Sequence, residues 1–185
     1  PAGQAHLAAD GVTLMTERLQ PGWTPTTPAP PPEAPAETAP APGPRGWRLA
    51  FATPGQLGSL APRSYALPPL RPGEFRLTVS ASSLQFKDVM LAHGLLPGIA
   101  GELGMETVGT VFEVHPVTAA GHPHLAVGAR VVALLTPPHG ALASHATAHA
   151  TLSCLAPPHW ADADIVAAPT AWMTVLYALR DRGRL

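Results

Sequence analysis

The sequence predicts a mainly β fold, a barrel or a sandwich, and three observations carry this prediction. First, the chain from residue 46 onward is a series of short apolar segments separated by glycine and proline. Second, residues 74–84 alternate with a period of two, which is typical of a half-buried strand. Third, a longer helical pattern occurs only near the C-terminus. With 185 residues and 46% hydrophobic side chains, one substantial domain is expected.

Proline divides the chain into parts. Ten of its 24 prolines lie between Pro21 and Pro44, where they prevent helix and sheet from propagating. We therefore interpret residues 21–45 as an interdomain linker of extended polyproline type, rather than a docking motif. Residues 1–20 are expected to end an upstream domain, residues 46–161 to form the β domain, and residues 162–185 to be helical.

The expected strands follow one another with turns between them. Their ranges are 47–52, 74–84, 107–114, 131–135 and 140–151. In the second strand Phe75, Leu77, Val79 and Ala81 form the apolar face, and Arg76 belongs to the opposite, polar face. Gly109 in the third strand predicts a bulge or a close approach of another backbone.

Helices are expected at three places. One covers residues 86–92 and stops at Gly94. Near the C-terminus, Asp162 is a candidate N-cap for residues 163–168, and Pro169 interrupts before a second helix over 170–182.

The second C-terminal helix has a distinct apolar stripe. Trp172, Leu176 and Leu179 lie along it at helical spacing, and Gly183 is a candidate C-cap. A helix with so much apolar surface is expected to pack on further protein.

Composition excludes several classes of function. The net charge is −1, so there is no basic footprint for nucleic acid or for an anionic membrane. No apolar run is long enough to span a membrane and no secretory signal is recognisable, so a cytoplasmic location is expected. The single cysteine, Cys154, excludes a disulfide framework and is interpreted as a small buried hydrophobic residue.

Motifs for nucleotide or metal binding are weak. No Gly-x-Gly-x-x-Gly or Walker loop occurs, so the chain has no dedicated phosphate cradle. His122 and His124 lack a third ligand, and His145 and His149 share a strand face, so ordinary hydrogen-bonded histidines are expected and no metal site. Ser144, beside His145, is not in a nucleophile elbow.

Acidic and basic candidates for chemistry are few. Lys87 and Asp88 open the first expected helix, where the carboxylate favours the positive end of the helix dipole. Glu106 lies in an apolar run and needs partners if it is buried. Two roles stay open for it: orienting a substrate loop, or holding neighbouring backbone amides.

Several ordered segments resemble one known family. They are SLQFKDVM (83–90), LAHGLLPG (91–98), GMETVGTV (104–111), LAVGARVVAL (125–134), GALASH (140–145) and AAPTAWMTVLYAL (167–179). In order and spacing they are similar to the medium-chain dehydrogenase/reductases, and most similar to the enoyl reductase domain of modular type I polyketide synthases. Residues 1–20 resemble, more weakly, the strand that closes the structural half of a ketoreductase.

The resemblance implies a GroES-like, partly open β-barrel with short helices and a C-terminal helix. In the family a Rossmann domain that binds NADPH follows the last matched helix, and no such domain is present in this chain. The implied reaction is the NADPH-dependent reduction of a 2-enoyl thioester on an acyl carrier protein. The implied neighbours are ketoreductase and dehydratase domains of a multifunctional enzyme of antibiotic biosynthesis.

The resemblance also assigns candidate residues. Lys87 and Asp88 match a basic and acidic pair near substrate and cofactor, Phe86 matches the aromatic residue beside them, and Thr174 matches a threonine near the nicotinamide. Leu96 stands where some enoyl reductases carry a tyrosine that donates the α-proton. By this resemblance Phe86, Lys87 and Thr174 contribute to cofactor binding, and Lys87 and Asp88 are the catalytic candidates.

Two further positions depart from the family pattern. Gln85 stands where the family usually has asparagine. Met105 stands at the position of a histidine ligand of zinc-dependent relatives, and this places the chain in the zinc-free branch.

Three readings of function stay open. In the first, the chain is the substrate-binding half of an enoyl reductase, and it is inactive alone because the cofactor half is missing. In the second, it is an inactive remnant that spaces neighbouring domains. The third, an unrelated small β-barrel that binds a ligand, is disfavoured by the matched segments.

Overall fold

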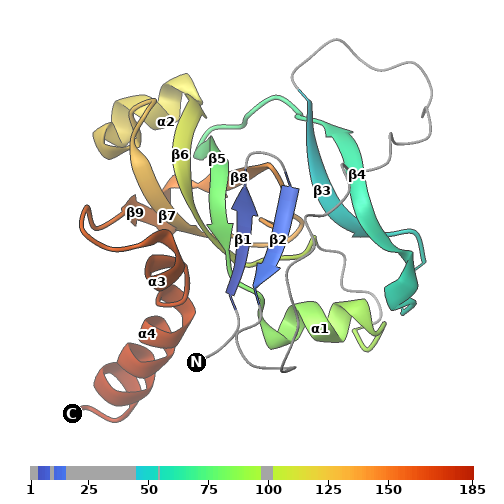
Figure 1. Cartoon of the computed structure of the whole chain (residues 1–185). Helices are drawn as coiled ribbons and strands as arrows, with labels where there is room; N and C mark the ends of the chain where they lie inside the picture. The colour runs from blue at the N-terminus through green and yellow to red at the C-terminus, as the bar shows by residue number, and fades with distance from the viewer. Residues whose placement is uncertain (1–3, 9–10, 16–44, 54, 97–101) are drawn as a thin grey trace.

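The computed structural model describes residues 4–8, 11–15, 45–53, 55–96 and 102–185. Nine strands and four α-helices make up this part of the chain (Figure 1). The strands are β1 (Gln4–Ala8), β2 (Gly11–Met15), β3 (Arg45–Phe51), β4 (Leu60–Ala66), β5 (Glu74–Ser82), β6 (Glu106–Val114), β7 (Arg130–Leu134), β8 (His145–His149) and β9 (Ser153–Leu155). The helices are α1 (Phe86–Ala92), α2 (Pro116–Gly121), α3 (Asp162–Val166) and α4 (Pro169–Leu176), and a π-helical segment, Tyr177–Arg182, continues α4.

The main sheet is a partly open, antiparallel barrel. Its strand order is β2-β1-β5-β6-β7-β9, and β8 also pairs with β5. β3 and β4 form a separate hairpin, which hydrogen bonds such as Leu49 N–H to Leu142 O connect to the barrel. This architecture confirms the predicted mainly β, GroES-like fold.

Strand β5 is the centre of this sheet. It pairs with β6 on one edge and with both β8 and β1 on the other. Phe75, Leu77 and Val79 point into the main core, as the alternation predicts. A register shift between Val79 and Ala81 then moves Ala81 into a second cluster. The predicted single apolar face is therefore correct only as far as the bulge.

Arg76 corrects a second expectation about this strand. It was predicted on the polar face, but it is only 2% exposed. Its guanidinium binds the Glu113 carboxylate and the Pro68 carbonyl, and the segment after β4 covers it. The charged side chain can be buried here because the Glu113 carboxylate and the Pro68 carbonyl both accept hydrogen bonds from its guanidinium.

Most other predicted elements are present with shifted ends. The third predicted strand starts at Glu106, and close approach at Gly109 is confirmed, because a Cβ there would collide with the Thr78 carbonyl oxygen. The last predicted strand is limited to His145–His149, because Ala150–Leu152 forms a 3-10 turn. Sequence reasoning missed β1, β4, α2 and the short β9.

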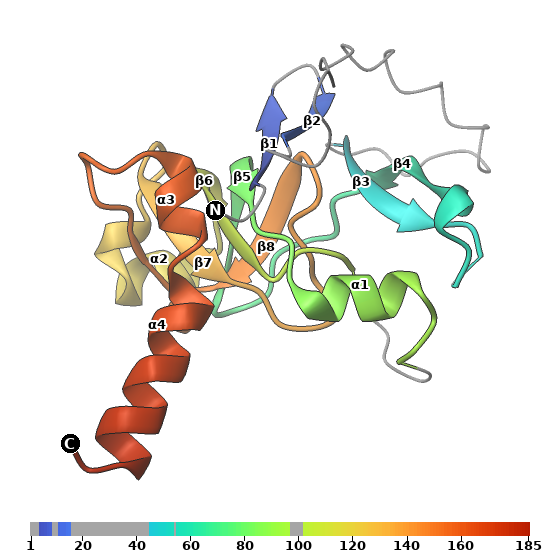
Figure 2. The same ribbon diagram turned by 60° about the horizontal axis from the view of Figure 1, so that its bottom comes forward.

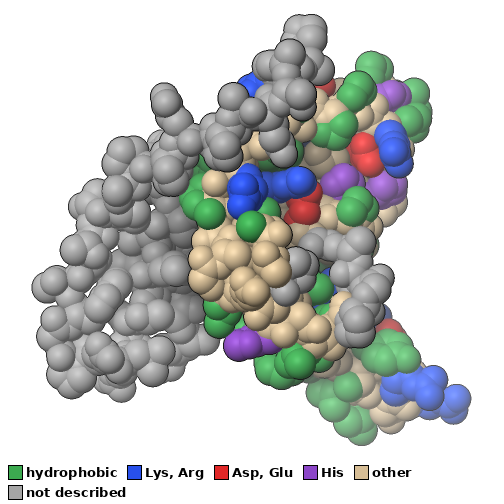
Figure 3. Space-filling model, turned by 90° about the vertical axis from the view of Figure 1, so that its right-hand side faces the viewer, with side chains coloured by type: hydrophobic (Ala, Val, Ile, Leu, Met, Phe, Trp, Pro, Cys, Tyr) green, Lys and Arg blue, Asp and Glu red, His purple; other side chains and the backbone are tan. Residues whose placement is uncertain are grey.

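The second core cluster positions the C-terminal helices. Ile165 and Val166 of α3 pack on Val108 of β6 and Val132 of β7, outside the barrel. α4 then continues away from the barrel and buries none of its residues (Figure 2). At its end a hydrophobic surface projects from the body and finishes in basic side chains (Figure 3), in keeping with Arg180 and Arg182 in the last turn.

Two helix-end predictions change in detail. The N-cap of α3 is Ala161, and Asp162 is the first helical residue. The second helix begins at Pro169, and its last part is π-helical before Gly183 in the C-cap position.

Two of the sequence predictions concern the linker and the domain boundaries. The predicted linker lies outside the described residues except for Arg45, which begins β3. The domain boundaries stay predictions. Within the described ranges, no helix is both long and apolar enough to cross a membrane.

Candidate functional site

The buried carboxylate of Glu106 joins two helix starts at one end of the barrel. Glu106 is the first residue of β6 and is fully buried. Its Oε1 accepts a hydrogen bond of 2.6 Å from the Thr170 backbone N–H in the first turn of α4. Its Oε2 accepts hydrogen bonds from the Ser83 hydroxyl and the Gln85 side-chain amide. Of the two roles left open by the sequence, these contacts favour the holding of backbone amides.

Asp88, in the first turn of α1, also accepts hydrogen bonds from backbone amides. Its side chain is 2% exposed. Oδ2 accepts from the Gln85 N–H at 2.8 Å, which caps the helix, and Oδ1 accepts from the Gly104 N–H at 2.9 Å. Gly104 has φ +87°, and a Cβ there would lie 2.7 Å from the Ser82 hydroxyl. The predicted placement of Asp88 at the helix N-terminus is confirmed, and its contacts are those of a structural carboxylate.

The other family-implied residues lie next to this network. Phe86 and Lys87 directly follow Gln85, and Phe86 is 75% exposed. Thr174 is exposed on α4, one turn after Thr170, and its hydroxyl donates to the Thr170 carbonyl at 2.7 Å. Both views show α1 and α4 at the same end of the barrel (Figures 1 and 2). Thr174 is thus connected to the start of α1, where Phe86 and Lys87 lie, through the hydrogen bonds of Thr170, Glu106 and Gln85.

A broad apolar groove runs along α4. Its volume is about 580 Å³, and β7, β9 and the C-terminal helices form its walls. Trp160 and Trp172 meet there edge to face with ring centroids 6.0 Å apart. Its lining residues include Val132, Leu134, Leu155, Ile165, Met173 and Leu176. The groove was not predicted from the sequence, although Trp172 and Leu176 of the apolar stripe on α4 line it.

Cys154 lines the same groove and corrects an earlier expectation. It was interpreted as a buried hydrophobic residue, but it is an exposed free thiol. The reason is that Cys154 pairs with Val132 of β7, so its side chain is on the sheet face that lines the open groove.

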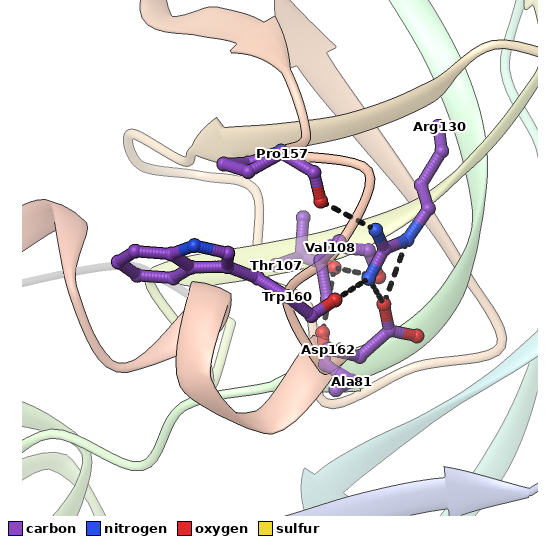
Figure 4. Close-up of polar contacts among 7 residues, drawn as sticks. All are labelled: Ala81, Thr107, Val108, Arg130, Pro157, Trp160 and Asp162. Atoms are coloured by element: carbon purple, nitrogen blue, oxygen red, sulfur yellow. Dashed lines mark hydrogen bonds and ion pairs between the residues drawn. The ribbon is translucent and has the colours of Figure 1, made fainter.

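Arg130 at the start of β7 holds the segment that leads into the helices (Figure 4). Its Nε donates to Asp162 Oδ1 at 2.9 Å, and Nη2 binds the same oxygen. Nη1 and Nη2 also donate to the carbonyls of Pro157 and Trp160, at 3.0 and 2.9 Å. The sequence places Arg130 only in the turn before a strand. Its partners lie 27 to 32 residues further along the chain, and no local sequence pattern marks them.

His145 was predicted to be an ordinary hydrogen-bonded histidine, and its pKa is lowered in the structure. The Tyr65 hydroxyl donates to the His145 carbonyl at 2.8 Å, and the His145 ring nitrogen Nδ1 lies 2.9 Å from Ser144 Oγ. Burial, with a smaller effect of the Arg76 guanidinium, lowers the pKa of His145. Burial, together with the Glu102 carboxylate, raises the pKa of Tyr65 to about 12. In the described ranges no group of three or more potential ligands could hold a metal ion.

Sequence comparison shows that the chain is similar to polyketide synthases. No family model matches the chain. It is 39% identical over 140 residues to the pikromycin polyketide synthase component PikAII of Streptomyces venezuelae, a match that covers 73% of this chain and 4% of that protein. It is 32% identical over 181 residues to the phenolphthiocerol synthesis polyketide synthase type I Pks15/1 of Mycobacterium bovis, covering 97% of this chain and 8% of the relative. The chain thus spans a small part of the curated relatives that it matches.

Solved structures show the same fold. The mycobacterial protein Rv1454c complexed with NADPH is 30% identical with a TM-score of 0.58, and the match covers 73% of this chain and 40% of that one. The CurK enoyl reductase is 19% identical with a TM-score of 0.65, with 76% of this chain and 44% of that chain covered. The chain is therefore homologous to a small part of modular type I polyketide synthases, and that part has the GroES-like fold found in the solved reductases.

Proposed function

We propose that this chain forms the substrate-side lobe of an NADPH-dependent enoyl reductase that acts on a 2-enoyl thioester carried by an acyl carrier protein. The observation that supports this most is the grouping of Phe86 and Lys87 on α1 with Thr174 on α4, around the Glu106 network. All three are exposed or half-buried, so a ligand can reach them.

The described residues fit one side of a nicotinamide cofactor. Phe86 offers an exposed ring, Lys87 a cation suited to phosphate or to a carbonyl oxygen, and Thr174 a hydroxyl. The sequence contains no glycine-rich phosphate loop. A second lobe must therefore supply the phosphate site, and the apolar surface of α4 and its groove offers that lobe a large area on which to pack.

The chemistry divides between the cofactor and the chain. When bound, NADPH supplies the hydride that reaches Cβ of the enoyl thioester, and a proton added at Cα completes the reduction. Lys87 is placed to orient the thioester or the cofactor by its charge. Leu96 has no proton to donate, so the α-proton comes from another group or from water.

We further propose that the reaction uses no zinc. Met105 occupies the position at which zinc-dependent relatives carry a histidine ligand, and a thioether is a poor ligand for Zn²⁺.

A second function, a catalytically inactive spacer module, is favoured by one observation. Leu96 replaces the tyrosine that some enoyl reductases use as proton donor. In that case the fold would be kept for its contacts with neighbouring domains, and the double bond would stay unreduced.

The test compares this chain alone with the longest natural polypeptide that contains it. Both are mixed with NADPH and a crotonyl-pantetheine thioester, and loss of the reduced nicotinamide is followed by absorbance. We expect turnover only in the longer polypeptide, with Lys87→Met lowering kcat/KM about tenfold or more and Asp164→Asn, an exposed site on α3, serving as control. Turnover by the chain alone would overturn its dependence on a second lobe. No turnover in the longer polypeptide would overturn the reductase and support the spacer.

A further inference from the structure

We propose that Glu106 is a positioning residue that fixes the start of α4 relative to the start of α1, and so sets the spacing between Thr174 and the pair Phe86 and Lys87. This proposal rests on the function proposed above for those three residues. The contacts that carry it belong to this chain and can be measured without cofactor or substrate.

The α4 side of the link is a chain of two hydrogen bonds. Pro169 occupies the first helical position, and the N–H of Thr170 after it is one of the first-turn donors that a helix cannot satisfy internally. Glu106 Oε1 accepts from it at 2.6 Å. The Thr170 carbonyl in turn accepts from the Thr174 hydroxyl at 2.7 Å. The rotamer of Thr174 is therefore held by a residue that Glu106 itself holds.

The α1 side of the link uses the other carboxylate oxygen. Gln85 is the N-cap of α1, and its amide donates to Glu106 Oε2 together with the Ser83 hydroxyl. The Gln85 backbone N–H donates to Asp88 Oδ2 at 2.8 Å, and its side-chain Nε2, which donates to Glu106, also lies 3.3 Å from Ser83 Oγ. Phe86 and Lys87 follow immediately and move with this cap.

Glu106 is suited to this role because its own backbone is rigid. It is paired with Leu134 of β7, and its carbonyl oxygen accepts from Ser82 Oγ at 3.0 Å and from the Ser83 N–H at 3.2 Å. An ionised carboxylate accepts on both oxygens, so it can serve donors from two helices at once. A neutral amide accepts on only one oxygen and forms weaker hydrogen bonds.

The test uses ¹⁵N-labelled full chain and the amide of Thr170 as its reporter. Glu106→Gln should move the Thr170 amide proton upfield and speed its hydrogen exchange about tenfold, because a charge-assisted hydrogen bond becomes neutral or is lost. Asp164→Asn removes the same charge from an exposed site on the preceding helix and should leave Thr170 unchanged.

The coupling between helices is tested by changing residues that do not belong to α4. Gln85→Met and Ser83→Ala each remove a donor from Oε2, and each should shift the Thr170 amide in the wild-type background but not in the Glu106→Gln background. If the Thr170 amide shifts in Glu106→Gln but in neither the Gln85 nor the Ser83 variant, the proposed link to α1 is overturned. A Thr170 amide indifferent to Glu106→Gln would overturn the whole proposal.

This outcome is distinguishable from that of the reductase assay. If the longer polypeptide fails to oxidise NADPH while the amide shifts appear as expected, the enzymatic function is overturned and the positioning of α4 is supported. If turnover is present, Gln85→Met should lower kcat more than it raises KM, because it disturbs the spacing of groups around the reacting atoms. An unchanged kcat together with silent amides would overturn the positioning role.

Discussion

Replacing Arg130 by methionine should destabilise the chain by about 2 kcal/mol. The guanidinium makes two contacts with Asp162 and one each with the carbonyls of Pro157 and Trp160. The ion pair is about one third exposed on both sides, at 34% and 31%, so solvent screening reduces its contribution to about 0.5 kcal/mol. The two hydrogen bonds from a charged donor to carbonyl oxygens supply the remaining ~1.5 kcal/mol, which is about 0.75 kcal/mol each after partial exchange with water.

The assay is equilibrium unfolding in urea, followed by tryptophan fluorescence. Asp162→Asn is the matched control because it removes only the charge partner and should cost less than about 1 kcal/mol. Arg130→Lys keeps the charge but cannot reach three acceptors, so it should resemble the methionine variant. The reasoning is refuted if Asp162→Asn costs as much as Arg130→Met, or if Arg130→Met changes the free energy of unfolding by less than about 0.5 kcal/mol.

Three further predictions concern single positions. Gly109→Ala should cost about 3 kcal/mol in urea unfolding, because the new Cβ would collide with the backbone oxygen of Thr78, which cannot move without breaking the β5–β6 pairing. Tyr65 has a pKa of about 12 against the ordinary 10.0, so its contribution to stability is complete below pH 10 and is lost as pH rises towards 12. The urea midpoint should therefore fall over this range in the wild type, and less in Tyr65→Phe; equal slopes would contradict the assignment. Cys154 should react with a thiol reagent in the native chain at the rate of an exposed thiol, and protection until unfolding would show that its side of the groove is covered.

The sequence predicted those parts of the fold that depend on local pattern. The alternation in β5 and the apolar run of β7 have periods that can be read within a few residues, and both strands are present. The short helix α1 was predicted by its acidic first turn and its glycine stop, and both features are observed, with Gly94 at φ +67°. Register shifts cannot be read in this way, which is why Ala81 was expected on the same face as Phe75 but packs in the second cluster.

The candidate site was predicted only as separate residues. Lys87 and Asp88 were selected because they open a short helix, and Glu106 because a carboxylate in an apolar run needs partners. The partners of Glu106 come from other parts of the chain. Thr170 is 64 residues from Glu106, and what connects them is a backbone N–H, which every residue except proline possesses. No side-chain pattern marks such a donor. The burial of Arg76 was missed for a similar reason, since its acceptor at Pro68 is a backbone carbonyl.

The position of β5 between three other strands has a consequence for how the chain opens. β6 pairs with one edge of β5, and β8 and β1 share the other edge. The backbone amides of β5 can therefore exchange with solvent only when its hydrogen bonds to several strands break together. Protection against deuterium should therefore be highest in this strand and equal to that of global unfolding. The short edge strand β9 and the helix α4, which buries no side chain, should exchange in smaller, separate events. The barrel can thus stay folded while the surface offered to a second lobe rearranges.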